Sequence, residues 1–173
     1  DRMRVYLFKR RGEWAAFTKR FTGSRSEVFL KVRNGGYSER GVSAIQYVLH
    51  EVTFPLFAHE GLHQYFYHQV GQRVPAWLNE GLAVACEGQR WSMTTRSCRV
   101  KEFDPWFNPV RRQAVEQAVL RERLHPLRKL LRTHPGEIID STGSALETYY
   151  AQVWALVLFL REGADGKYAD GFG

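Results

Sequence analysis

The sequence predicts an α+β fold, in which a small N-terminal twisted sheet with a helix precedes a helical core and C-terminal helices. Up to about residue 50, short segments rich in β-branched and aromatic residues are separated by turn signals. After that point, apolar residues recur at helical spacing between proline and glycine boundaries. We expect one domain over residues 1–173, with a sheet-containing part (1–50), a pair of metal-site helices (51–90), and a loop with helices (91–173).

The N-terminal part combines strands with one helix. Apolar residues at 14, 17 and 21 predict a helix over 14–21, and Gly23 is its expected stop. Asn34-Gly35-Gly36 predicts a turn or a bulge. The β-branched and aromatic segments predicted to be strands are 5–8, 28–32 and 42–48.

Proline and glycine bracket the two helices that follow. Pro55 suits a first helical turn and Gly71 suits the position after a helix end, which predicts a helix over 55–70. Pro75 and Gly88 bracket a second helix in the same way.

The C-terminal part is predicted to be a loop followed by helices. Residues 89–106 lack a clear period and are predicted to be a long loop, with a hairpin as the alternative. Three helices then begin at local start signals: Asn108-Pro109, leading to about 123; Pro126, leading to 131; and a Ser144-x-x-Glu147 capping box, leading to about 161.

The charge of the chain admits two interpretations. Its net charge is +7, and basic residues cluster at 9–11, 111–112 and 121–132. The clusters are typical either of a polyanion partner or of solvated helix faces. Acidic residues are interspersed and no nucleic-acid motif is present, so we favour solvated faces and expect no nucleic-acid partner. No apolar run reaches 18 residues, so we expect no membrane span in this chain.

Two cysteines, Cys86 and Cys98, are too few for a four-cysteine zinc site. They form either one disulfide, which would imply an oxidising compartment, or two free thiols. The sequence does not decide the cellular compartment, although it weakly favours a secreted or periplasmic location. It gives no indication of the oligomeric state. The chain begins at Asp1 and ends at Gly173 with no evident stop, so we expect it to have been trimmed from a longer protein.

Residues 59–63 form an HExxH motif on the first of the two predicted helices. Residues four apart lie on one face of a helix, so His59 and His63 can reach a single metal ion. Glu60 follows the first histidine directly, which places its carboxylate beside the ion rather than on it. The alternative is two surface histidines on an amphipathic helix.

Glu80 is a carboxylate within an otherwise apolar helix. Burying it is costly unless it is paired or bound to metal. From His63 the first helix rises roughly 12 Å, and Glu80 lies roughly 7 Å back along the second, so a helical hairpin can return it to the level of the histidines. Three nitrogen and oxygen ligands with one open position are typical of catalytic zinc.

HEGLHQ (59–64) followed by PAWLNEGLA (75–83) resembles the gluzincin metallopeptidases, the relatives of thermolysin and the aminopeptidases. The chain looks most like a group of mostly uncharacterised bacterial peptidase-like domains in that clan, which share a late helix similar to 150–157. The resemblance implies a zincin-like fold, Zn²⁺ on His59, His63 and Glu80, and Glu60 as general base. Val84 departs from it, because thermolysin relatives often place an acid there as a partner for a zinc-bound histidine.

The resemblance also suggests supporting residues. Relatives often stabilise the oxyanion with a tyrosine or histidine from a later helix, which makes Tyr150 our candidate; a core tyrosine is the equal alternative. Other residues considered for this role are Tyr149, His125 and His134. Gluzincin substrates lie antiparallel along an edge strand, which suggests Gly35, Gly36 and Tyr37 as substrate-binding residues; a plain hairpin turn is the alternative.

We therefore expect a zinc-dependent hydrolase that cleaves peptide bonds in a peptide or protein substrate. One alternative is a zinc hydrolase acting on a non-peptide amide, for example in a cell-wall polymer. The other is a catalytically inactive zinc-binding domain that recognises a partner. The intact Glu60 argues against an inactive domain, since such a site is free to lose its base.

Overall fold

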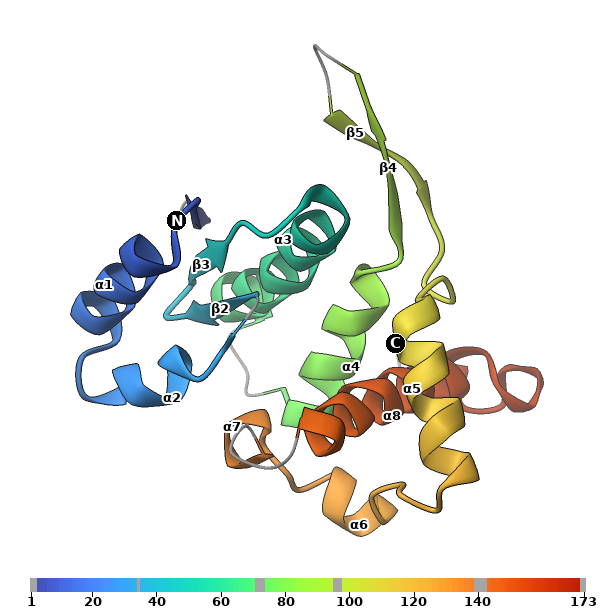
Figure 1. The fold of residues 1–173 in the computed structure, drawn as a ribbon. Helices are drawn as coiled ribbons and strands as arrows, with labels where there is room; N and C mark the ends of the chain where they lie inside the picture. The colour runs from blue at the N-terminus through green and yellow to red at the C-terminus, as the bar shows by residue number, and fades with distance from the viewer. Residues whose placement is uncertain (1–2, 34, 71–73, 95–97, 139–142, 172–173) are drawn as a thin grey trace. The chain divides into compact units, whose positions relative to one another are not determined.

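The computed structural model describes residues 3–33, 35–70, 74–94, 98–138 and 143–171 (Figure 1). The fold is α+β, as the sequence predicts. The chain divides into two compact units, Asp1–Arg73 and Val74–Gly173. In the described part of the chain, no helix is both long and apolar enough to cross a membrane.

A three-stranded sheet forms the centre of the first unit. Its strands lie in the order β1 (Arg4–Phe8), β3 (Val42–Gln46) and β2 (Gly36–Glu39). β1 runs parallel to β3, and β2 runs antiparallel to it, so β2 is an edge strand. Helix α1 (Arg11–Thr22) packs on this sheet through the fully buried Trp14, whose indole donates a hydrogen bond to the Ala44 carbonyl at 3.1 Å.

The segment predicted to be a strand over 28–32 is instead helical, so that prediction was wrong. Gly23 ends α1 with a positive φ of 59°, as expected, and a 3₁₀ turn (Gly23–Arg25) leads into α2 (Ser26–Leu30). The Arg11 guanidinium donates to the carbonyls of Leu30 and Val32, which satisfies backbone acceptors at the end of the helix. These tertiary contacts override the β propensity of the segment.

Helix α3 (His50–Tyr65) begins five residues earlier than predicted and continues into a π-helical turn, Phe66–Val70. The Thr53 amide already donates to the Leu49 carbonyl at 2.8 Å, so the first turn precedes Pro55. Pro55 therefore lies inside the helix, where its missing N–H removes one intrahelical hydrogen bond. The helix packs against β2 and β3, which positions its second half beside the sheet.

The second unit consists of helices and one β-hairpin (Figure 1). Helices α4 (Ala76–Cys86) and α5 (Pro109–Leu120) pack against the long α8 (Gly143–Glu162). Two short helices, α6 (Leu127–Leu130) and α7 (Pro135–Ile138), precede α8, and two 3₁₀ turns, Ala164–Gly166 and Ala169–Gly171, follow it. The hairpin of β4 (Gln89–Met93) and β5 (Cys98–Phe103) projects from the helices. Of the two predictions for residues 89–106, the hairpin is therefore confirmed and the long loop without strands is not.

Helix starts in the second unit follow their predicted signals with one exception. Asn108 caps α5 by accepting a hydrogen bond from the Arg111 amide at 3.2 Å, and Pro126 precedes α6. Ser144, however, lies within α8 rather than at its N-cap, so the predicted capping box does not start that helix. Its carbonyl accepts a hydrogen bond from the Thr148 hydroxyl instead.

The close approach of α4 to α8 depends on a glycine. A Cβ atom on Gly81 would lie 2.5 Å from Val157 Cγ2 and 2.6 Å from the Val153 carbonyl oxygen. Only a residue without a side chain fits this distance, and the core cluster of Val84, Ala85, Trp154 and Leu158 forms around it. Gly81 thereby sets the position of its neighbour Glu80 on α4.

Cys86 is a free thiol at the end of α4, which agrees with the second of the two alternatives given for it from sequence. The side chain of Cys98 lies outside the described residues. Burial, with a further contribution from the Glu87 carboxylate, raises the pKa of the Cys86 thiol.

Candidate metal centre

The three residues of the HExxH motif lie together in the second half of α3. His59 is 7% exposed and Glu60 is 4% exposed, while His63 is half-buried. The His59 and His63 rings have centroids 4.8 Å apart and planes at 83°. The four-residue spacing thus places both imidazoles side by side on one helix face, as predicted.

The sheet holds α3 at the motif itself. The hydroxyls of Ser38 on β2 and Ser43 on β3 both reach the backbone carbonyl of Glu60, at 3.0 and 3.4 Å. One turn later, the fully buried Gln64 donates to the Arg4 carbonyl and to the Ser43 hydroxyl. These contacts fix the rotation of α3 about its axis, and hence the direction of the motif side chains. Sequence analysis missed all of these serine and glutamine contacts.

The Glu60 carboxylate is enclosed by protein. Its Oε2 atom is buried and accepts no hydrogen bond from any residue that the structure describes. An acceptor of this kind is costly to bury without a donor. It fits a group that takes a proton from a water molecule beside the histidines, which is the role predicted for Glu60.

Glu80 lies on α4 of the second unit, half-buried, with its Oε2 atom shielded from solvent. It acts electrostatically on Tyr149 of α8. Burial first, and the Glu80 and Glu137 carboxylates second, raise the pKa of Tyr149 far above its ordinary value. The carboxylate predicted from the apolar context of α4 is therefore shielded from water, as that context implied.

The two neighbouring tyrosines of α8 have different environments. Tyr149 is fully buried and donates its hydroxyl to the Thr133 carbonyl at 3.1 Å. Tyr150 is half-buried, packs against both core clusters of the second unit, and has the Arg111 guanidinium 5.1 Å from its ring centroid. The hydrogen bond of Tyr149 and its electrostatic interaction with Glu80 were not anticipated by sequence analysis.

The two histidines considered as substitutes for Tyr150 lie elsewhere in the second unit. The His125 ring is hydrogen-bonded to the Ala145 carbonyl at 3.1 Å, which fixes it to the start of α8. His134 is exposed, and its backbone amide donates to Glu137. Neither arrangement favours either histidine over Tyr150.

The predicted substrate-binding residues lie at the edge strand β2 and just before it. Gly36 pairs with Ile45 of β3, and a Cβ there would lie 2.9 Å from Ile45 Cγ1, so the glycine is needed by the sheet itself. Tyr37 turns its side chain into the core, where its hydroxyl donates to Thr18. This segment therefore presents its backbone at a sheet edge, whereas the tyrosine ring lies in the core.

The two adjacent imidazoles on α3 are donors of a kind that could hold a metal ion such as zinc. The enclosed Glu60 carboxylate on the same helix is a proton acceptor. A family model described as a protein of unknown function (DUF1570) matches residues 48–171, which include α3, α4 and α8. Comparison with curated proteins and with solved structures gives no significant match.

Proposed function

We propose that this chain, which belongs to the DUF1570 family, is a zinc-dependent hydrolase that cleaves peptide bonds. One observation carries the proposal: the His59 and His63 rings lie side by side on α3, and the buried Glu60 follows His59 on the same helix. Two imidazoles and a general base are the parts that the HExxH motif supplies in metallopeptidases.

We propose His59, His63 and Glu80 as the zinc ligands. Bound zinc lowers the pKa of water and polarises a carbonyl group. A zincin-like arrangement of the metal-site helices belongs to the same proposal, on the strength of the sequence resemblance to the gluzincins.

The residues of the chain would divide the remaining work. Glu60 accepts a proton from the attacking water and later passes it to the leaving amine, since its Oε2 atom has its acceptor capacity open. Tyr150 donates a hydrogen bond to the developing oxyanion. The free backbone edge of β2 aligns the peptide as an added strand.

The test combines zinc analysis with a peptide-library digest of protein purified without chelator. We expect about one zinc per chain and cleavage that Glu60→Gln abolishes while zinc is retained, because the amide cannot accept a proton. Glu51→Gln, an exposed substitution on the same helix, is the matched control and should keep both. Zinc loss in Glu60→Gln would make Glu60 a ligand and contradict its role. Zinc binding without cleavage of any peptide would instead favour the partner-binding or non-peptide alternatives.

A further inference from the structure

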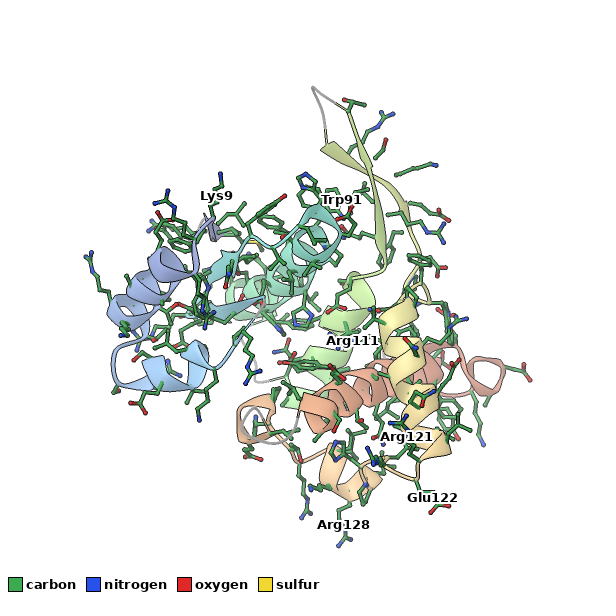
Figure 2. All side chains as sticks on the ribbon, viewed as in Figure 1. Lys9, Trp91, Arg111, Arg121, Glu122 and Arg128 are labelled. Carbon is green, nitrogen blue, oxygen red and sulfur yellow. The ribbon has the colours of Figure 1, made fainter. Side chains whose placement is uncertain are left out.

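A basic and apolar surface covers residues 119–132 in the second unit; we name it the α5–α6 patch. Five of its large apolar residues are 40–76% exposed: Val119, Leu120, Leu124, Leu127 and Leu131. Five basic residues alternate with them: Arg121, Arg123, Arg128, Lys129 and Arg132. Figure 2 labels three residues of the patch: Arg121 and Glu122 at the end of α5, and Arg128 on α6.

The architecture holds the patch in an exposed position. Glu122 ends α5 with a positive φ of 51°, a conformation that turns the chain sharply after Leu120. Leu130, only 1% exposed, packs with Tyr149 and Val153 and anchors α6 to the core. The fold therefore buries one leucine of α6 and leaves Leu127 and Leu131 exposed.

The positive charge of the patch is not compensated locally. Within the described part of the chain, none of its five basic side chains forms an ion pair, whereas Arg90, Arg111 and Arg161 each do. Glu122 is the one acidic residue among positions 119–132. An uncompensated cationic surface of this kind attracts an anionic partner.

A cavity adjoins the patch. Arg121 and Arg123 line a space of about 300 Å³ between α5 and α8, together with Ser144, Thr148 and one acid, Glu147. This volume is at the lower end of small-ligand sites. The Arg121 and Arg123 guanidinium groups are donors that suit a phosphate or carboxylate group, so an anionic headgroup has a place beside the leucines.

We propose that the α5–α6 patch docks the protein peripherally on an anionic lipid surface. At such a surface, apolar side chains enter the boundary between headgroups and acyl chains, while neighbouring arginines and lysines contact the headgroups. The alternation of leucine and basic residues in the patch meets both requirements at once.

Two other occupants fit the patch less well. Single-stranded nucleic acid is bound on aromatic stacking platforms, and the patch contains no Phe, Tyr or Trp while its leucines would stay exposed. A second copy of the chain would place five cations against five, which is unfavourable. A lipid surface is the occupant that takes up both the charge and the leucines.

The charge part of the proposal is tested by cosedimentation with vesicles of phosphatidylcholine, with and without phosphatidylserine. We expect binding only with phosphatidylserine. Each basic residue at such a surface accounts for about fivefold in affinity, so Arg121→Gln/Arg128→Gln should weaken binding about 30-fold. Arg99→Gln/Lys101→Gln removes two exposed charges from β5 instead and should leave binding nearly unchanged.

The apolar part is tested by Leu120→Ser/Leu127→Ser, with Val100→Ser on β5 as the control. The leucine variant should lose the binding that survives high salt, which screens the charges but not the apolar contact. Equal binding to both vesicle types, or equal losses in patch and control variants, would overturn the proposal. So would tighter binding to a DNA oligonucleotide that depends on the arginines and not on the leucines. None of these outcomes bears on the zinc-hydrolase proposal.

Discussion

At the scale of single residues, Glu60 and Glu80 each have a carboxylate oxygen that the protein shields from water, although the fold does not require a carboxylate at either position. Each lies on a helix beside residues that pack well, and an apolar residue at either position would avoid the desolvation of a charge. Shielded carboxylates are common where a metal or a proton is handled. We therefore propose distinct roles for them, Glu80 as a metal ligand and Glu60 as the proton acceptor, and the two roles can be separated by experiment.

We expect Glu80→Gln to weaken zinc binding by more than the 10–100-fold that changes outside the ligand shell cause. Glutamine keeps the shape of the side chain but removes the charge that favours the cation. Zinc affinity is measured by competition with a chelator, with Glu116→Gln on the exposed side of α5 as the control. Equal affinities in wild type and Glu80→Gln would place the third ligand elsewhere, and the gluzincin assignment would fall with it.

The tyrosine pair of α8 gives a second prediction at this scale. If Tyr150 donates to the oxyanion, Tyr150→Phe should lower turnover about 10²–10³-fold with little change in zinc content or stability. Tyr149→Phe removes a buried hydrogen bond to the Thr133 carbonyl, so it should lower the free energy of unfolding by about 1–3 kcal/mol. Peptide turnover and urea unfolding of both variants distinguish the roles. Full activity in Tyr150→Phe would move the catalytic role to another residue.

The geometry of the HExxH motif could be predicted from sequence because a helix fixes the relation of residues four apart. His59 and His63 needed nothing else. The Ser38 and Ser43 contacts with the Glu60 carbonyl could not be predicted, since they depend on how β2 and β3 pack against α3. The inward direction of Tyr37 was missed because a strand pattern alone does not say which face meets α1.

At the scale of elements, helix boundaries were predictable where a local signal coincides with the helix end. Asn108 before α5 and Gly23 after α1 are such positions. The start of α3 was missed because the sequence pattern places Pro55 in the first turn of the helix. The helix in fact begins at His50, after the N-cap Leu49, and tolerates Pro55 in its interior. The strand predicted over 28–32 failed because packing of α2 and the Arg11 hydrogen bonds outweigh a weak β preference.

Two glycines, each next to a proposed site residue, give opposite predictions for these helices. Gly81→Ala should destabilise the chain by about 1–3 kcal/mol, because the new methyl group overlaps Val157 and the Val153 carbonyl. Gly61→Ala should stabilise it by up to about 1 kcal/mol, because, apart from its chain neighbours and the backbone of α3 itself, no atom of the described residues lies within 4 Å of the new Cβ.

Urea unfolding of the metal-free variants measures both effects. If Gly81→Ala is as stable as wild type, the close contact of α4 with α8 relaxes without penalty. A destabilised Gly61→Ala would instead reveal a contact on α3 beyond the described residues.

At the scale of the whole molecule, each compact unit contains a weak acid whose pKa is raised. Tyr37 lies in the core of the first unit, where burial raises its pKa and the Thr18 hydrogen bond partly offsets the effect. Cys86 lies in the second unit, where burial and the Glu87 carboxylate both raise the pKa of its thiol. A raised pKa in the folded state means that folding holds the proton more tightly. The resulting stabilisation is complete below the ordinary pKa, about 8.5 for a thiol and about 10 for a phenol, and is lost above it.

The net charge of +7 has the opposite effect on stability up to the isoelectric point of about 9.6. As the pH rises toward that point, repulsion among the basic residues decreases, which stabilises the fold. We therefore expect the free energy of unfolding to change little between pH 7.5 and 9 and to fall above about pH 10, by at most about 1.4 kcal/mol per pH unit for each acid. Urea unfolding across this range tests it. Cys86→Ala should remove the part of the fall that begins near the thiol pKa. Tyr37→Phe should remove a share of the part that begins near the phenol pKa, because Tyr149, whose pKa is also raised, contributes the rest. If the double variant falls as steeply as wild type, other groups control the alkaline transition, and the burial of these two acids contributes nothing to it.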